Sequence, residues 1–134
     1  MNHPEQKRLK DLKVLFVDDN KINQMLMAHS LLRKFDIAVD LASDGKIALQ
    51  MLENEIYDFV LMDLRMPVMN GKEAIRAIRA FGGSYFSNLP ICIYISMIEE
   101  DEIKELKEIG MTSFLYSKPF DFDGLHIELL KCLK

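Results

Sequence analysis

The stretch VLFVDDN, residues 14–20, decides the fold, because four apolar residues run directly into two aspartates and an asparagine. A short apolar run that ends at charged or turn-forming residues is typical of a strand buried on both faces of a parallel sheet. Further along, FVLM (59–62) ends at Asp63, and FLYS (114–117) ends at Lys118. In an open parallel sheet, residues just past the carboxyl ends of the strands face one ligand-binding crevice. Four charged residues are therefore predicted to meet at one edge of the sheet: Asp18, Asp19, Asp63 and Lys118.

The segments between these strands have helical spacing and helix end signals. Strands are predicted at about 13–17, 37–42, 58–62, 91–96 and 112–116. Helices are predicted at about 20–34, from 44–45 onward, at about 72–80, at about 99–109 and from about 121 to the end. Strand and helix alternate five times, which implies a parallel sheet with helices on both faces and right-handed crossovers.

Several helix ends carry recognisable signals. Asn20 is the expected N-cap of the first helix. Ser96 and Glu99 have the spacing of a capping box, and Gly110 is the expected stop of the helix that follows. The segment FGGSYFSN (81–88) is expected to be a loop. One face of the first helix is predicted to carry residues at helical spacing: Ile22, Met25, Leu26, His29 and Leu32.

Length and composition indicate one ordinary globular domain. The chain has 134 residues, 49% of them hydrophobic, and a net charge of −4 with no basic block, so nucleic-acid binding is not indicated. No apolar stretch is long enough to span a membrane, and the N-terminus is too polar for a signal peptide. Cys92 and Cys132 do not have metal-ligand spacing, so buried thiols in a reducing cytoplasm are expected. We therefore expect a cytoplasmic protein without direct membrane contact.

The adjacent carboxylates Asp18 and Asp19 limit the ligands that this turn can bind. Acidic pairs after a strand are common as solvated or helix-capping residues. Two carboxylates would nevertheless repel a bare phosphate, so a phosphate-cradling loop is disfavoured here. Carboxylate oxygens suit Mg²⁺, which prefers hard oxygen ligands and takes one or two protein carboxylates with several waters.

Asp63 is the expected reacting group. Its simplest role is to cap the next helix, but it directly follows four apolar residues, so the sheet should hold its backbone rigidly. A carboxylate held in this way can attack phosphorus and form an acyl phosphate. Phosphoryl transfer depends mainly on positioning and charge neutralisation, which a metal ion and Lys118 would supply. Ser96 is either a helix cap or a hydroxyl that reaches a phosphoryl oxygen.

Together, four fragments resemble the receiver domains of bacterial two-component response regulators. They are VLFVDDNKINQ (14–24), VLMDLRMPVMNG (60–71), Ser96 at the end of the fourth strand, and SKPF (117–120). The sequences of these fragments are most similar to those of the receivers of hybrid histidine kinases. The resemblance implies a flavodoxin-like, doubly wound α/β fold with five parallel strands in the order 2-1-3-4-5. It also implies a single receiver domain over residues 1–134, with its core at about 12–133.

The resemblance implies roles for the acidic residues. Asp63 would accept a phosphoryl group from a phosphohistidine on a histidine kinase or a histidine phosphotransfer protein. Asp19 and Asp63 would bind Mg²⁺ directly, together with the backbone carbonyl of Arg65, and Asp18 would act through water. The chain would catalyse only its own phosphorylation and dephosphorylation.

The resemblance further implies that Ser96 and Lys118 bind the phosphoryl oxygens. Repacking around the fourth and fifth strands would then alter partner binding. The family's switch aromatic stands three positions before the lysine, where this chain has Leu115, so Phe114 and Tyr116 beside it and Ser96 are the switch candidates. A homodimer is left open.

Two alternatives remain at this point. The family usually has a small residue after the serine or threonine, and this chain has Met97, which would crowd access to the phosphoryl group. A degenerate receiver that binds a partner without phosphorylation is therefore one alternative. A magnesium-dependent phosphohydrolase with an aspartyl nucleophile is the other. Such enzymes usually place two aspartates two positions apart after one strand, whereas Asp18 and Asp19 are adjacent.

Overall fold

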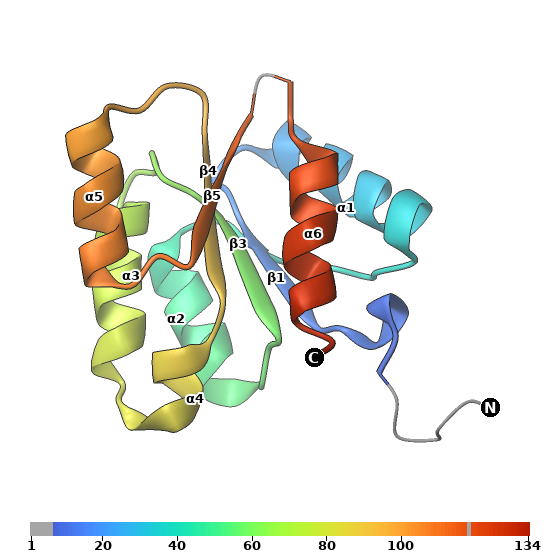
Figure 1. Ribbon diagram of the computed structural model, residues 1–134, viewed down its shortest axis with the longest axis horizontal. Helices are drawn as coiled ribbons and strands as arrows, with labels where there is room; N and C mark the ends of the chain where they lie inside the picture. The colour runs from blue at the N-terminus through green and yellow to red at the C-terminus, as the bar shows by residue number, and fades with distance from the viewer. Residues whose placement is uncertain (1–6, 118) are drawn as a thin grey trace.

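The computed structural model describes residues 7–117 and 119–134, which alternate strands and helices along most of their length (Figure 1). A short 3-10 helix at Leu9–Asp11 comes first. The strands are β1 (Val14–Val17), β2 (Asp40–Ala42), β3 (Phe59–Asp63), β4 (Ile91–Ile95) and β5 (Ser113–Tyr116). The α-helices are α1 (Lys21–Phe35), α2 (Gly45–Asn54), α3 (Gly71–Ala80), α4 (Gly83–Asn88), α5 (Glu100–Ile109) and α6 (Phe122–Lys131).

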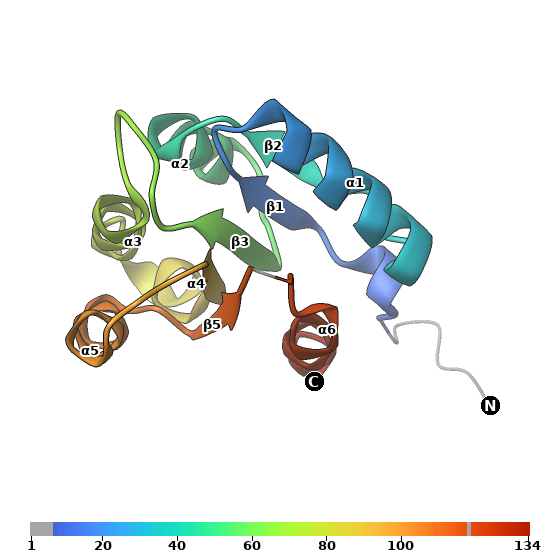
Figure 2. The same cartoon turned by 90° about the horizontal axis from the view of Figure 1, so that it is seen from above.

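The five strands form one parallel sheet in the order β2-β1-β3-β4-β5, which confirms the predicted fold class. Seen from above, α1 and α6 cover one face of the sheet, and α2, α3 and α5 cover the other (Figure 2). Val17 pairs with Met62, and one position further along Asp63 pairs with Tyr94. The carboxyl ends of β1 and β3 therefore lie side by side.

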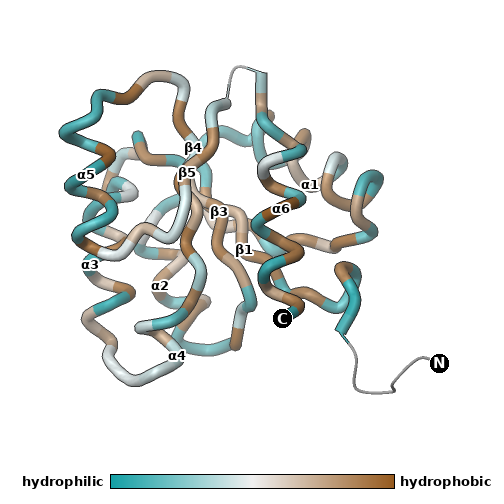
Figure 3. Tube along the Cα trace, in the orientation of Figure 1, coloured by the Kyte–Doolittle hydropathy of each residue, from teal (hydrophilic) through white to brown (hydrophobic). Residues whose placement is uncertain are grey.

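Each face of the sheet has its own hydrophobic core, because successive residues of a strand point to opposite faces. Leu15 and Val17 of β1 pack with residues of α2, α3 and α5, whereas Val14 and Phe16 pack with residues of α1 and α6. The central strands are accordingly mostly hydrophobic (Figure 3), with Asp63 at the end of β3 as the charged exception. Continuous apolar runs thus reflect burial on both sides, as expected.

The predicted apolar face of α1 does not pack against the core, so this prediction is wrong. The helix buries Met27 and Leu31, and packs them against the sheet. The face predicted from the spacing instead points to solvent, with exposed fractions of 67% for Ile22, 71% for Met25 and 61% for Leu26. Leu32 and His29 on the same face are also exposed. The helix has two apolar stripes, and periodicity alone does not tell which one packs inward.

Two further expectations are corrected by the structure. The segment 81–88 is not a simple loop, because Gly83–Asn88 forms the short helix α4. Ser96 is not a helix cap, because α5 begins four residues later, with Glu99 at its N-cap position and no side-chain capping bond. Asn20 does cap α1 by accepting a hydrogen bond from the Asn23 backbone N–H at 2.9 Å. Gly110 ends α5 in the left-handed conformation, as expected.

Within residues 7–117 and 119–134, no helix combines the length and the apolar character needed to cross a lipid bilayer.

Candidate functional site

Three carboxylates meet at the carboxyl edge of the sheet. Asp18 and Asp19 follow β1, and Asp63 ends the neighbouring strand β3. One carboxylate oxygen from each lies within 4.8 Å of the others. This geometry brings together three of the four charged residues predicted to converge; the fourth, Lys118, lies outside the described residues.

Asp18 is the buried member of the cluster, with an exposed fraction of 0%. Its Oδ1 accepts a hydrogen bond from the Asn20 backbone N–H at 2.8 Å. Its Oδ2 accepts from the Asn23 side-chain amide at 3.0 Å and from the Tyr94 hydroxyl. A buried carboxylate needs such donors, since an uncompensated charge away from water is costly. Asp18 is therefore held in place by groups from the β1–α1 loop, from α1 and from β4.

Tyr94 is the residue of this site that sequence reasoning missed. It lies inside the apolar run ICIYI of β4 and has an exposed fraction of only 7%. Burial and the hydrogen bond to Asp18 raise the pKa of Tyr94 well above its ordinary value, so the hydroxyl keeps its proton and acts as the donor. The signal in the sequence is a single polar group in a strand that is otherwise entirely apolar.

Asp63 is half-buried, and burial raises its pKa from the ordinary 3.8 to about 6. The Arg65 backbone N–H, which donates to Asp63 Oδ1 at 3.2 Å, acts in the opposite direction. The negative charges of Asp18 and Asp19 raise the pKa further. Three carboxylates this close repel one another, so the cluster favours a bound cation.

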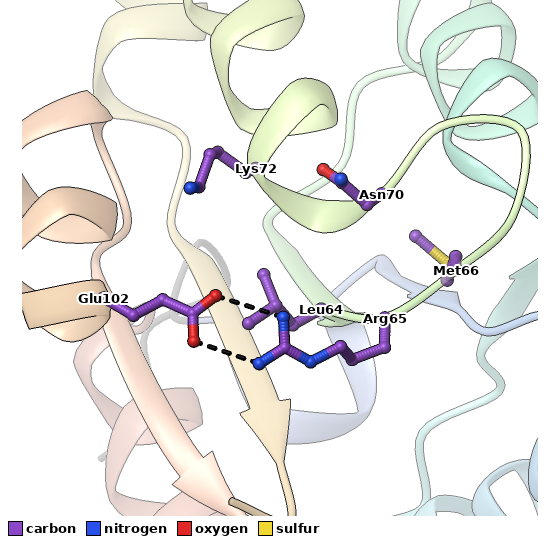
Figure 4. A pocket seen from close by; sticks show the side chains of 6 residues that line it. All are labelled: Leu64, Arg65, Met66, Asn70, Lys72 and Glu102. Atoms are coloured by element: carbon purple, nitrogen blue, oxygen red, sulfur yellow. Dashed lines mark hydrogen bonds and ion pairs between the residues drawn. The ribbon is translucent and has the colours of Figure 1, made fainter. Parts of the chain in front are cut away.

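Arg65 connects the site to α5. Its guanidinium makes two parallel hydrogen bonds to the Glu102 carboxylate, at 3.1 and 3.0 Å (Figure 4). Nearby, Lys72 of α3 pairs with Glu105 of α5 at 2.9 Å. Arg65, Lys72 and Glu102 help to line a pocket of about 330 Å³, together with Leu64, which follows Asp63 directly. The loop that follows Asp63 is thus tied to the helix across the crevice.

Ser96 is exposed at the end of β4 and shares an open pocket with Arg65 and Met97. Met97 is 80% exposed, so its side chain stands beside the site and not in the core. Among the switch candidates, Phe114 is half-buried and Tyr116 is 53% exposed. Their rings contact each other edge to face at 5.7 Å between centroids.

The residues of the cluster fit a magnesium ion. The donor set consists of carboxylate oxygens, the hard ligands that Mg²⁺ prefers, and hydrogen bonds from Asn20 and Asn23 hold the Asp18 carboxylate. Among the described residues, the only group of three or more acidic, histidine or cysteine side chains close enough to share a metal ion is Asp18, Asp19 and Asp63.

Comparison with known proteins identifies the family. The family model of the response regulator receiver domain matches residues 14–130. Hybrid signal transduction histidine kinase K of Dictyostelium discoideum is 33% identical over 119 residues, which are 85% of this chain and 10% of that protein. The curated relatives include response regulators and hybrid histidine kinases, and the chain spans 10% to 26% of the length of most of them.

Solved structures agree with this result. The receiver domain of sensor histidine kinase PA1611 from Pseudomonas aeruginosa, which has magnesium coordinated in its active site cleft, is 31% identical with a TM-score of 0.77. That match covers 91% of this chain and 97% of the other. The Ssk1 receiver domain of Saccharomyces cerevisiae, crystallised with the histidine phosphotransfer protein Ypd1, is 26% identical with a TM-score of 0.77, covering 91% and 88%. The chain therefore belongs to the response regulator receiver domains of two-component signal transduction.

Proposed function

We propose that Asp63 is the phosphoacceptor of a single receiver domain, with its core at about residues 12–133. The observation that carries the proposal is the convergence of Asp63 with Asp18 and Asp19 at one edge of the sheet. An Asp63 carboxylate oxygen would attack the phosphorus of a phosphohistidine. The new P–O bond forms as the P–N bond breaks, and the nitrogen keeps the bonding electron pair. The products are an acyl phosphate on Asp63 and an unmodified histidine on the partner.

Charge neutralisation is the main demand of this transfer. Asp19 and Asp63, with the backbone carbonyl of Arg65, would hold Mg²⁺ directly, and Asp18 would act through water. Bound Mg²⁺ would neutralise part of the negative charge on the phosphoryl group. Ser96 and Lys118 would bind the phosphoryl oxygens, a role that the sequence motif supports for both residues.

The partner is a histidine kinase or a histidine phosphotransfer protein, acting on a cytoplasmic receiver. In receivers generally the output is a change in partner binding, and here Ser96, Phe114 and Tyr116 are the candidates for that switch. Phe114 and Tyr116 lie on β5, an edge strand of the sheet, and their rings contact each other. The chain itself would catalyse no reaction beyond gaining and losing its own phosphoryl group.

A direct test is phosphoryl transfer followed by peptide mass spectrometry. Incubation with a phosphorylated histidine phosphotransfer protein and Mg²⁺ should add one phosphoryl group to the peptide that contains Asp63. Asp63→Asn should gain none, because an amide cannot form the acyl phosphate. The protein donor is preferred because Met97 stands beside Ser96 and would slow small donors. Phosphorylation of another residue, or of Asp63→Asn, would refute the assignment.

The exposed apolar residues of α1 offer the partner a docking surface. Ile22, Met25 and Leu26 are each more than 60% exposed and lie on the first turns of the helix that follows Asp18 and Asp19. Exposed apolar patches of this kind commonly mark protein–protein contacts. A partner docked here would bring its phosphohistidine to the acidic cluster.

Met25→Lys is therefore expected to slow transfer from the protein donor by about tenfold or more, as for a residue central to an interface. The rate with a small acyl phosphate should not change, because that donor does not dock on α1. Ile56→Lys is the matched control, since Ile56 is also apolar and 75% exposed. It precedes β3, at the amino ends of the strands, whereas the acidic cluster lies at their carboxyl ends. Equal effects of the two substitutions would argue against a docking role of α1.

A further inference from the structure

Tyr94 carries the one polar group of the core-forming strand β4, and packing does not require it. Its ring stacks on Phe16, with 5.6 Å between centroids and an angle of 18°. Phe120 contacts the same ring edge to face at 5.9 Å. A phenylalanine would satisfy both contacts, because they involve only the ring. The hydroxyl therefore needs another explanation.

The hydroxyl reaches a member of the acidic cluster from two strands away. Asp63 of β3 pairs in register with Tyr94 of β4, and β1, which Asp18 follows, lies on the other side of β3. The side chain of Tyr94 spans the width of β3 and donates its hydrogen bond to Asp18 Oδ2. Both partners are buried, with exposed fractions of 7% for Tyr94 and 0% for Asp18, so solvent water competes little for this bond.

The donors around Asp18 leave it little freedom. A carboxylate offers about four acceptor positions. Within the described chain, three are used, by the Asn20 backbone N–H, the Asn23 amide and the Tyr94 hydroxyl. Two of these donors share Oδ2, which leaves one acceptor position on Oδ1 for a water molecule of a metal ion's hydration shell. Removal of the Tyr94 hydroxyl would free one side of Oδ2 and allow the carboxylate to rotate.

We propose that Tyr94 is a positioning residue for magnesium binding, because its hydroxyl fixes the Asp18 carboxylate in the orientation that the metal's hydration shell requires. This inference rests on the proposed function, since it concerns the same acidic cluster. Hydrogen bonds to metal-binding groups commonly change metal affinity by tenfold or more when they are removed. Tyr94 acts only through Asp18 and does not itself contact the metal or the phosphoryl group.

The test is the Mg²⁺ affinity measured by isothermal titration calorimetry on the unphosphorylated chain. Tyr94→Phe should weaken binding by about tenfold, while circular dichroism and a cooperative melting curve show that the fold is retained. Tyr57→Phe is the matched control, because Tyr57 is also a buried tyrosine whose hydroxyl reaches a carboxylate, Asp40, at 2.7 Å. Tyr57 precedes β3 at the amino ends of the strands, away from the acidic cluster. Loss of its hydroxyl should therefore leave the Mg²⁺ affinity within about twofold of the parent.

A double-mutant cycle separates positioning from a general effect on the fold. In an Asp18→Asn background, Tyr94→Phe should cause no further loss of Mg²⁺ affinity, because the group that the hydroxyl holds is already changed. An undiminished affinity of Tyr94→Phe in the parent chain, or an equal loss in the Asp18→Asn background, would overturn the inference. Failure of the proposed metal site is a different outcome, because the parent chain would then bind no Mg²⁺ and Asp19→Asn would change nothing.

Discussion

Asp63→Asn is expected to make the metal-free protein more stable at neutral pH, by about 1–2 kcal/mol in the free energy of unfolding. Burial and the neighbouring carboxylates raise the pKa of Asp63 from 3.8 to about 6, so its charge disfavours the folded state. The corresponding upper limit is about 3 kcal/mol, at ~1.4 kcal/mol for each pKa unit. Solvent screening of a half-buried group reduces that value. Chemical denaturation in a chelating buffer measures the difference in the free energy of unfolding between Asp63→Asn and the parent chain.

The difference between variant and parent should depend on pH in a defined direction. Above about pH 6 Asp63 is ionised in both the folded and the unfolded state, and the full destabilisation is present. Between about 6 and 3.8 the folded state binds a proton that the unfolded state does not, so the parent gains stability as the pH falls. The stability advantage of Asp63→Asn should therefore shrink through this window. An advantage that is constant with pH would show that charge is not its cause.

Magnesium and a matched substitution complete this experiment. Mg²⁺ at about a hundredfold excess over its Kd should stabilise the parent by ~2.7 kcal/mol and the variant by much less. Asp58→Asn should have the opposite effect to Asp63→Asn, because Asp58 accepts hydrogen bonds from Lys7 Nζ at 2.7 Å and from the Lys13 backbone N–H at 2.8 Å. A loss of stability in Asp63→Asn without a response of the parent to Mg²⁺ would contradict a shared metal pocket.

Arg79→Ala is expected to destabilise the protein by about 3 kcal/mol, because one guanidinium serves three backbone carbonyls. Arg79 donates to the carbonyl of Phe86, within α4, at 2.7 Å and to that of Leu89, just after α4, at 2.8 Å. It also donates to the Gly110 carbonyl, at the end of α5, at 2.5 Å. Its removal leaves partly buried acceptors without this donor. For a domain of this size the melting temperature should fall by about 10 °C.

Two controls show whether the three carbonyls are the reason. Arg79→Lys keeps the positive charge but cannot donate in three fixed directions, so it should recover only part of the loss. Arg76→Ala removes an arginine of the same helix, and the one ion pair of Arg76 within the described residues is an exposed contact with Glu105 at 3.6 Å, so it should change stability by ~0.5 kcal/mol or less. A loss below about 1 kcal/mol for Arg79→Ala would contradict the bridging role.

The sheet and the acidic cluster could be predicted because each depends on a short-range pattern. VLFV and FVLM are apolar on every residue, which is the pattern of a strand buried on both faces, and the aspartates stand directly after them. A parallel arrangement of such strands brings the residues after them to one edge. The convergence of Asp18, Asp19 and Asp63 follows from those two facts alone.

The misplaced elements depend on contacts between distant segments. The spacing of apolar residues in α1 fits two stripes, and only the packed sheet selects Met27 and Leu31 for burial. Gly82 and Gly83 indicate a loop, and both do adopt positive φ angles, of 77° and 85°. The helix α4 that follows is held by Arg79 and by Tyr85, whose hydroxyl bonds the Tyr57 backbone at 2.8 Å.

Ser96 and Tyr94 show two different limits of sequence patterns. The capping-box spacing of Ser96 and Glu99 is present, but α5 begins only at Glu100, so the acidic residues that follow sit in its first turn without the serine cap. No local sequence pattern around Tyr94 identifies Asp18 as its hydrogen-bond partner, because Asp18 is 76 residues away in the sequence. Only the register of β1, β3 and β4 brings the two side chains together.

The turn at Gly82–Gly83 and the acidic cluster lie at opposite ends of the strands (Figure 1). Both glycines are exposed, and a side-chain carbon added at either would meet no atom within 4 Å. Reporter groups, affinity tags or whole fusion partners grafted into this turn would therefore stand clear of the acidic cluster. The domain can in this way be tethered or labelled at the end of the sheet that lies away from the acidic cluster.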